Sequence, residues 1–219
     1  MNDDVGRART AAQTVALAGT GASGMPYGLR LLECLLGAGV RVQLLYSQAA
    51  QIVARQEMGI TLPSRPADIP GALSAHIAIP EGRLEVFGRE EWFAPMASGS
   101  NPPDAMVICP CSMGSLAAIA AGLADNLIER AADVVLKEGR RLILVPRETP
   151  YSILHLENML RLARAGAVIL PPNPGFYHRP QTVADLVDFV VARLLDQLGV
   201  THDLFRRWGD PEDRDRSER

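Results

Sequence analysis

The sequence has few cysteines, no metal-ligand spacing among its histidines and no long apolar run. Its three cysteines, Cys34, Cys109 and Cys111, form no Cys-x-x-Cys motif, so neither a disulfide framework nor a cysteine zinc site is indicated. The four histidines are scattered along the chain, and we expect no bound metal. No apolar run is long enough to span a membrane, and residues 1–13 lack the apolar segment of a secretory signal. These absences favour a cytoplasmic protein with reduced thiols and no membrane contact.

Charge and composition are those of an ordinary globular protein. The 22 basic and 25 acidic residues give a formal net charge of -3, which argues against nucleic acid or an anionic membrane as a partner. With 219 residues, of which 47% are hydrophobic, the chain can bury one sizeable core. We predict one domain over residues 14–208, a flexible arm over residues 1–13 and a charged, flexible tail over residues 209–219.

Short apolar runs alternate with helical patterns along the chain. We expect strands over residues 14–19, 40–46, 84–87, 105–109, 142–145 and 167–170. We expect helices over residues 25–36, 49–57, 112–122, 127–138, 151–165 and 183–198. This alternation predicts a single-domain α/β fold with a doubly wound, mostly parallel sheet, Rossmann-like or flavodoxin-like, and helices on both faces. The carboxyl ends of the strands should then meet at one edge.

The turn after the first predicted strand reads Gly19-Thr20-Gly21-Ala22-Ser23-Gly24, a GxGxxG pattern. A dinucleotide site would require a carboxylate ending the second strand, which instead ends in Tyr46-Ser47-Gln48. A mononucleotide phosphate fits better, held by backbone N–H groups of residues 21–23 and by the hydroxyls of Ser23 and Ser47. The alternative is a tight glycine turn in which Ser23 only caps the first helix.

Three further groups of polar residues follow predicted strands or share a helix face. The segment from Cys109 to Ser115 opens a helix with small residues, which suits a carbonyl-rich ring or a phosphate, or plain N-capping. Arg130 and Lys137 share one helix face, either solvated or binding an anion. Arg147-Glu148 is either an ion pair or an anion-binding arginine beside a proton donor.

Long strings of sequence, rather than one short pattern, carry a family resemblance. The strings lie at residues 110–134, 145–150 and 171–180 and read PCSMGSLAAIAAGLADNLIERAADV, VPRETP and PPNPGFYHRP. Through them, residues 14–200 resemble the flavin prenyltransferase (UbiX-type) family. The resemblance implies an enzyme that joins the dimethylallyl group of dimethylallyl monophosphate to N5 and C6 of reduced FMN. The product, prenylated FMN, serves UbiD-type decarboxylases, in ubiquinone biosynthesis among other routes.

The same resemblance implies roles for individual residues. FMN-binding residues are Gly21, Ala22, Ser23, Ser47, Ser112, Met113, Gly114, Ser115 and Arg130. Residues that hold the prenyl phosphate are Lys137, Arg147, Tyr177 and Arg193. Catalytic residues are Glu148, Ser23, Lys137 and Arg147, with Trp92 and Trp208 as candidates to face the allylic cation. Glu57 resembles a further acidic site residue.

The resemblance also implies a homododecamer whose sites are shared between subunits. Because several cationic groups can balance a monophosphate, we predict a metal-independent reaction. One alternative is a flavin-dependent cysteine decarboxylase of the related fold, which the absence of a histidine from the helix at residues 25–36 disfavours. The other is a non-catalytic FMN-binding protein, in which Glu148 and the extra basic residues would have no purpose.

Overall fold

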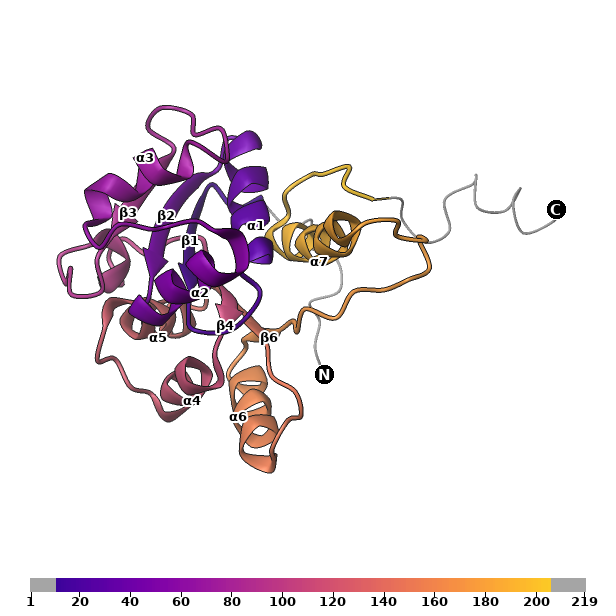
Figure 1. The fold of residues 1–219 in the computed structure, drawn as a ribbon. Helices are drawn as coiled ribbons and strands as arrows, with labels where there is room; N and C mark the ends of the chain where they lie inside the picture. Colours follow the sequence, from indigo (N-terminus) through magenta and orange to yellow (C-terminus); the bar gives the residue numbers. More distant parts are fainter. Residues whose placement is uncertain (1–10, 206–219) are drawn as a thin grey trace.

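The fold is a six-stranded parallel sheet with helices on both faces (Figure 1). The computed structural model describes residues 11–205. Along the sheet the strands run in the order β3-β2-β1-β4-β5-β6. The strands are β1 (Thr14–Gly19), β2 (Arg41–Tyr46), β3 (Leu84–Phe87), β4 (Ala105–Cys111), β5 (Arg141–Pro146) and β6 (Val168–Ile169).

The helices confirm the alternation that the sequence predicts. They are α1 (Met25–Gly37), α2 (Gln48–Met58), α3 (Ile69–Leu73), α4 (Met113–Ala121), α5 (Leu127–Lys137), α6 (Ile153–Arg164) and α7 (Val183–Leu198). Two 3-10 turns, η1 (Pro66–Asp68) and η2 (Pro95–Ala97), lie in the irregular region before β4. Each strand and long helix expected from the sequence is present, with ends shifted by two residues or fewer.

Alternate side chains of each strand enter two separate cores. On β4, Val107 and Cys109 belong to one core, whereas Met106 and Ile108 belong to the other. Helices α1, α2, α3 and α7 cover the first core, and α4, α5 and α6 cover the second. A strand covered on both faces needs apolar residues throughout, which is why the strands read as continuous apolar runs.

The described chain is held in place before the predicted start of the domain at Thr14. Ala12 is buried, and its N–H donates to the carbonyl of Leu198 at 3.1 Å. The N–H groups of Gln13 and Thr14 both donate to the carboxylate of Asp104 at 3.0 Å. The ordered fold therefore includes residues 12 and 13, which the sequence analysis assigned to the arm. The predicted tail, residues 209–219, lies outside the described residues.

Candidate active site

The direction of the chain connections reverses between β1 and β4, which are neighbours in the sheet. β2 and β3 lie on the far side of β1, and β5 and β6 lie on the far side of β4. Such a reversal opens a crevice beyond the carboxyl ends of the two strands. A cavity of about 440 Å³ lies at this point. It is lined by Thr20, Gly21, Ser47, Gln48, Ala49, Arg89, Ser112, Gly114, Ser115, Asn126, Ile128 and Glu129.

The turn between β1 and α1 forms one wall of the cavity. A β-carbon at Gly21 would lie 2.5 Å from that of Ala49, so only glycine fits there. The prediction that Ser23 caps α1 is wrong. Gly24 is the N-cap, with φ 120, and Glu57 accepts hydrogen bonds from the N–H groups of Gly24 and Met25 at 3.0 and 2.9 Å. A carboxylate already accepts from these two amides, so neither is free to bind a ligand phosphate.

Serine hydroxyls at two helix starts supply donors to the cavity. Ser47 caps α2 by accepting from the N–H of Ala50 at 3.1 Å, and its own O–H remains able to donate. Ser112 caps α4 by accepting from the N–H of Ser115 at 3.2 Å, and the two hydroxyl oxygens lie 3.1 Å apart. One of the two hydroxyl hydrogens is not used in these bonds and remains able to donate to a ligand. The predicted capping role of Ser112 is thus confirmed, and it is compatible with ligand binding.

The residues present fit FMN, which combines a flat, carbonyl-rich ring with an anionic phosphate. At Gly114 a β-carbon would meet only the Ser112 hydroxyl at 4.0 Å, so the cavity wall is open to a flat group. Asn126 uses its Oδ1 to accept from the N–H groups of Ile128 and Glu129, which leaves its amide N–H groups free to donate. The volume is also within the usual range for cofactor sites, about 300–1,000 Å³.

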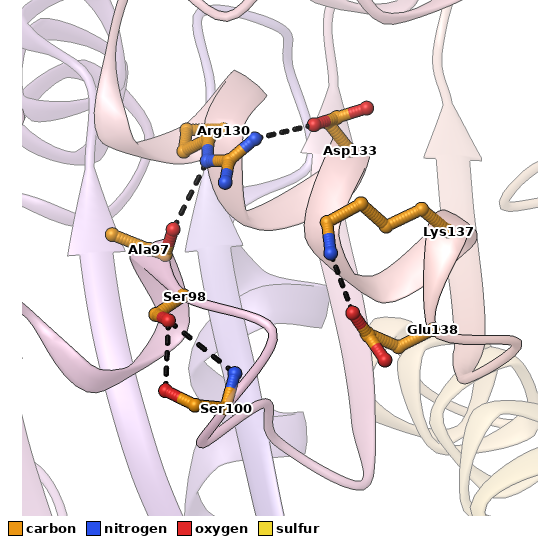
Figure 2. Close-up of polar contacts among 7 residues, drawn as sticks. All are labelled: Ala97, Ser98, Ser100, Arg130, Asp133, Lys137 and Glu138. Carbon is orange, nitrogen blue, oxygen red and sulfur yellow. Dashed lines mark hydrogen bonds and ion pairs between the residues drawn. The ribbon is translucent and has the colours of Figure 1, made fainter.

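The cavity contains part of the predicted flavin-binding set. Gly21, Ser47, Ser112, Gly114 and Ser115 line it. The other four do not line it: Ala22 and Met113 are buried, Ser23 is exposed, and Arg130 is bonded to other residues. Arg130 donates from Nε to the Ala97 carbonyl at 3.0 Å and pairs with Asp133 at 2.7 Å (Figure 2).

Several residues that line the cavity carry no predicted role, among them Thr20, Arg89 and Glu129. Arg89 could have been found, because it comes two residues after β3 and therefore at the carboxyl edge of the sheet. Thr20 and Glu129 lie within motifs in which only neighbouring residues have a predicted role.

A second group of polar residues surrounds Lys137 at the end of α5. Its ammonium lies 2.5 Å from the Glu138 carboxylate and holds the pKa of Glu138 below its ordinary value (Figure 2). Gly99 lies against this pair, since a β-carbon there would come within 2.6 Å of the Lys137 nitrogen. The hydroxyls of Ser98 and Ser100 bond to each other at 2.8 Å beside it. Lys137, its partner and the serine hydroxyls are mostly exposed.

Within one chain, Lys137 lies near the start of β5 and Arg147 lies just after its end, so the two residues are at opposite ends of the parallel strands. Lys137 ends α5 just before β5 begins at Arg141, whereas Arg147 directly follows the end of β5. The ends of a six-residue strand are about 20 Å apart at the usual rise of about 3.3 Å per residue. Within this chain the two side chains therefore do not meet.

Tyr177 packs against α7, the helix that carries Arg193. The Tyr177 ring contacts Phe189 edge-on, with ring centroids 5.7 Å apart. Arg193 is one helical turn beyond Phe189 on the same face. It pairs with Asp196 at 2.7 Å and is half exposed, and Tyr177 is 47% exposed.

Arg147 and Glu148 leave the end of β5 without pairing with each other. The Arg147 N–H donates to the Cys111 carbonyl at 3.3 Å, which places this residue beside the end of β4. Glu148 is half-buried and accepts from the N–H of Thr149 at 3.2 Å. In the described part of the chain no ion pair joins the two side chains, so the structural ion-pair alternative is wrong.

The three cysteines are free thiols and remain protonated at neutral pH. Burial raises the pKa of Cys34 to about 11 and that of Cys111 to about 12. Burial, and then the neighbouring Cys111, raise the pKa of Cys109. None of the three is an activated nucleophile.

Three further points concern metals, membranes and the tryptophans. Within residues 11–205 no group of three His, Cys, Asp or Glu side chains could hold a metal ion. In the same range, no helix combines the length and the apolar character needed to cross a membrane. Trp92 is 44% exposed on the segment after β3, and Trp208 lies outside the described residues.

The chain is similar to several characterised proteins. A family model described as Flavoprotein matches residues 7–195. A protein named Flavin prenyltransferase UbiX from Pseudomonas aeruginosa is 56% identical over 198 residues, which cover 90% of this chain and 95% of that protein.

Two solved structures share the fold and much of the sequence. A dodecameric FMN-dependent UbiX-like decarboxylase from Escherichia coli O157:H7 is 42% identical, with a TM-score of 0.79, covering 90% of this chain and 100% of that chain. AnUbiX (PadA1), in complex with FMN and dimethylallyl pyrophosphate, is 39% identical, with a TM-score of 0.81, covering 91% of this chain and 98% of that chain.

Proposed function

The chain belongs to the flavin prenyltransferase family of flavoproteins, and we propose that it transfers the dimethylallyl group of dimethylallyl monophosphate to reduced FMN. The observation that carries this function is the cavity at the reversal point between β1 and β4. Its glycine wall, serine hydroxyls and free amide donors suit a flat ring bearing carbonyl groups and a phosphate. FMN is therefore the co-substrate, bound between the turn after β1 and the turn after β4.

The reaction needs charge stabilisation and proton transfer, but no oxidant. Reduced FMN, when bound, supplies N5 and C6 as the positions that accept the prenyl group. The allylic C–O bond breaks and phosphate leaves with the bonding electrons, so cationic side chains beside the phosphate lower the barrier. Of the two hydrogens displaced at N5 and C6, one saturates the middle carbon of the former double bond and the other leaves on phosphate. Glu148 moves the proton at the departing phosphate oxygen.

The prenyl phosphate site is completed by more than one subunit. Arg147 and Lys137 lie at opposite edges of the sheet, and both are exposed. A neighbouring copy can bring its Lys137, with Gly99 beside it, to the edge where Arg147 and Glu148 end β5. Tyr177 and Arg193, exposed along α7, contribute the remaining contacts to the phosphate.

The exposed apolar side chains of α6 support a homo-oligomer. This helix extends from the rim of the fold (Figure 1), and only Leu162 of its twelve residues is buried. Ile153, Leu154, Leu156 and Leu160 are 74%, 69%, 52% and 50% exposed. Apolar side chains this exposed mark an interaction surface. The assembly is a dodecamer, as in the similar protein from Escherichia coli.

The product and its destination complete the proposal. Prenylated FMN is delivered to a UbiD-type decarboxylase. Ser23, exposed at the first turn, orients the flavin, while Trp92 and Trp208 are the candidates to stabilise the allylic cation through a ring face. The three free thiols favour a cytoplasmic location.

Anaerobic incubation of the protein with reduced FMN and dimethylallyl monophosphate tests this function. We expect a flavin product heavier by one prenyl unit in mass spectrometry, formed equally with and without EDTA. A protein that binds FMN but never forms this product would be the non-catalytic alternative. A chain that instead decarboxylates a cysteine-containing peptide would be a cysteine decarboxylase. Loss of turnover in EDTA, restored by magnesium, would contradict metal independence.

A further inference from the structure

Thr20 joins the two turns that form the walls of the cavity. Its hydroxyl accepts a hydrogen bond from the N–H of Ser112 at 2.7 Å and donates one to the carbonyl of Pro110 at 3.1 Å. Its own N–H donates to the same Pro110 carbonyl at 3.0 Å. Three hydrogen bonds therefore connect Thr20, which follows β1, to Pro110 near the end of β4 and to Ser112, which follows β4. Thr20 is 1% exposed, although it lines the cavity.

These bonds act where the register between the strands becomes irregular. β1 and β4 pair regularly up to Ala18 and Ile108, and no further pair joins them beyond that point. The pairing of β4 with β5 shifts between Ile108 and Cys111. The sheet ladder therefore does not fix the relative position of the two turns. Beyond the last regular pair, the backbone N–H and the hydroxyl of Thr20 both bond to Pro110, and only the hydroxyl reaches Ser112.

The close packing of α1 against β4, and the lack of another acceptor within residues 11–205, leave the Thr20 hydroxyl as the partner of the Ser112 N–H. A β-carbon at Gly28 of α1 would lie 2.5 Å from the carbonyl oxygen of Cys109, so α1 and β4 are already in close contact. The Ser112 N–H has no other acceptor among the described residues. An apolar side chain at position 20 would leave this donor unpaired beside the ligand, where water could compete for it only by entering the cavity.

We propose that Thr20 is a positioning residue for flavin binding, which holds Gly21 on one wall at a fixed distance from Ser112, Gly114 and Ser115 on the other. This inference rests on the proposed function, because it takes the ligand of the cavity to be FMN. Thr20 acts through the Ser112 backbone, since its only hydroxyl hydrogen is donated to Pro110 and is not available to a ligand acceptor. It was not among the site residues that the sequence analysis selected.

The test compares three variants of the full-length protein. Thr20→Val keeps the shape and removes the hydroxyl, and Thr20→Ser keeps the hydroxyl. Thr14→Val is the matched control, because it makes the same chemical change at the other end of β1, where no side-chain hydrogen bond of Thr14 is present in the described structure. FMN affinity is measured by fluorescence titration, and the visible circular dichroism of bound FMN is recorded at saturation.

We expect Thr20→Val to fold at 25 °C, to bind FMN about tenfold more weakly, and to show altered flavin dichroism even at saturation. Thr20→Ser and Thr14→Val should match the wild type in both measurements. A Thr20→Val protein with wild-type affinity and dichroism would overturn the proposal, as would one that is unfolded, since the hydroxyl would then support the fold as a whole. If Thr20→Ser were as weak as Thr20→Val, the methyl group would be responsible instead. A wild type that binds no FMN would contradict the proposed function itself.

Discussion

The carboxylate of Glu57, near the end of α2, lies 2.9 Å from the backbone nitrogen of Met25 at the start of α1. It also accepts the N–H of Gly24, so one side chain satisfies two amides at a helix N-terminus. A negative charge at this end of a helix is favourable because the helix dipole is positive there. Glu57 therefore connects two helices that pack on the same face of the sheet.

Glu57→Gln should lower the free energy of unfolding by about 0.5–1 kcal/mol, because the amide keeps one acceptor but loses the charge. Urea denaturation measures this effect. Glu81→Gln is the control, since Glu81 is exposed and forms no ion pair or side-chain hydrogen bond within the described residues. Equal stability of the two variants would contradict the capping role of Glu57.

Lys137→Ala and Arg147→Ala should each be nearly inactive, and should regain activity when their subunits are mixed during assembly. Each loses one cation from the phosphate site, at a cost of roughly 1.5–3 kcal/mol in substrate binding. If one site takes these two residues from different subunits, random mixing restores about a quarter of the sites. Mixing Lys137→Ala with Lys137→Met is the control, because no site then contains a lysine. If the first mixture regained no activity, Lys137 and Arg147 would not contribute to one site from different subunits.

Glu148→Gln should retain FMN binding and lose turnover by roughly 10²–10⁴-fold, the range for removing a general acid or base. The amide preserves the shape of the side chain and its contact with the Thr149 N–H, while the titratable group is lost. Single-turnover rates and FMN titration separate the two effects. An unchanged rate would show that Glu148 has a structural role only.

Alkaline pH should destabilise the protein through its thiols. In the folded state the pKa values of Cys34 and Cys111 are about 11 and about 12, against an ordinary value of 9.0. The unfolded chain therefore releases these protons first, so the stabilising contribution is complete below pH 9 and is lost as pH rises toward 12. Denaturation at several pH values measures the free energy of unfolding. This free energy should fall less steeply with rising pH in Cys34→Ala.

Iodoacetamide labelling provides an independent check on the same thiols. At pH 8 the native protein should react slowly, and denaturant should expose all three cysteines to labelling. Rapid modification of Cys109 or Cys111 in the native state would show that their surroundings are more open than the β4 core indicates.

The sequence by itself determined the layered fold and predicted five of the residues that line the cavity. Strands such as β4 must be apolar throughout because helices cover both of their faces, and the run at residues 105–109 shows this directly. Gly21, Ser47 and Ser112 were predictable because each follows a strand, and parallel strands bring their carboxyl ends to one edge. Local patterns of this kind depend on residues that are close in the chain.

Only the tertiary structure decided which polar groups satisfy one another across the sheet. The cap of α1 comes from Glu57, more than thirty residues away in sequence, and the Ser112 N–H is bonded by Thr20, which is 92 residues away. The separation of Lys137 from Arg147 likewise follows from the direction of β5, which places the end of α5 and the end of the strand at opposite edges. Sequence patterns describe periodicity along the chain, whereas hydrogen bonds between distant segments depend on distances that exist only once the sheet has formed.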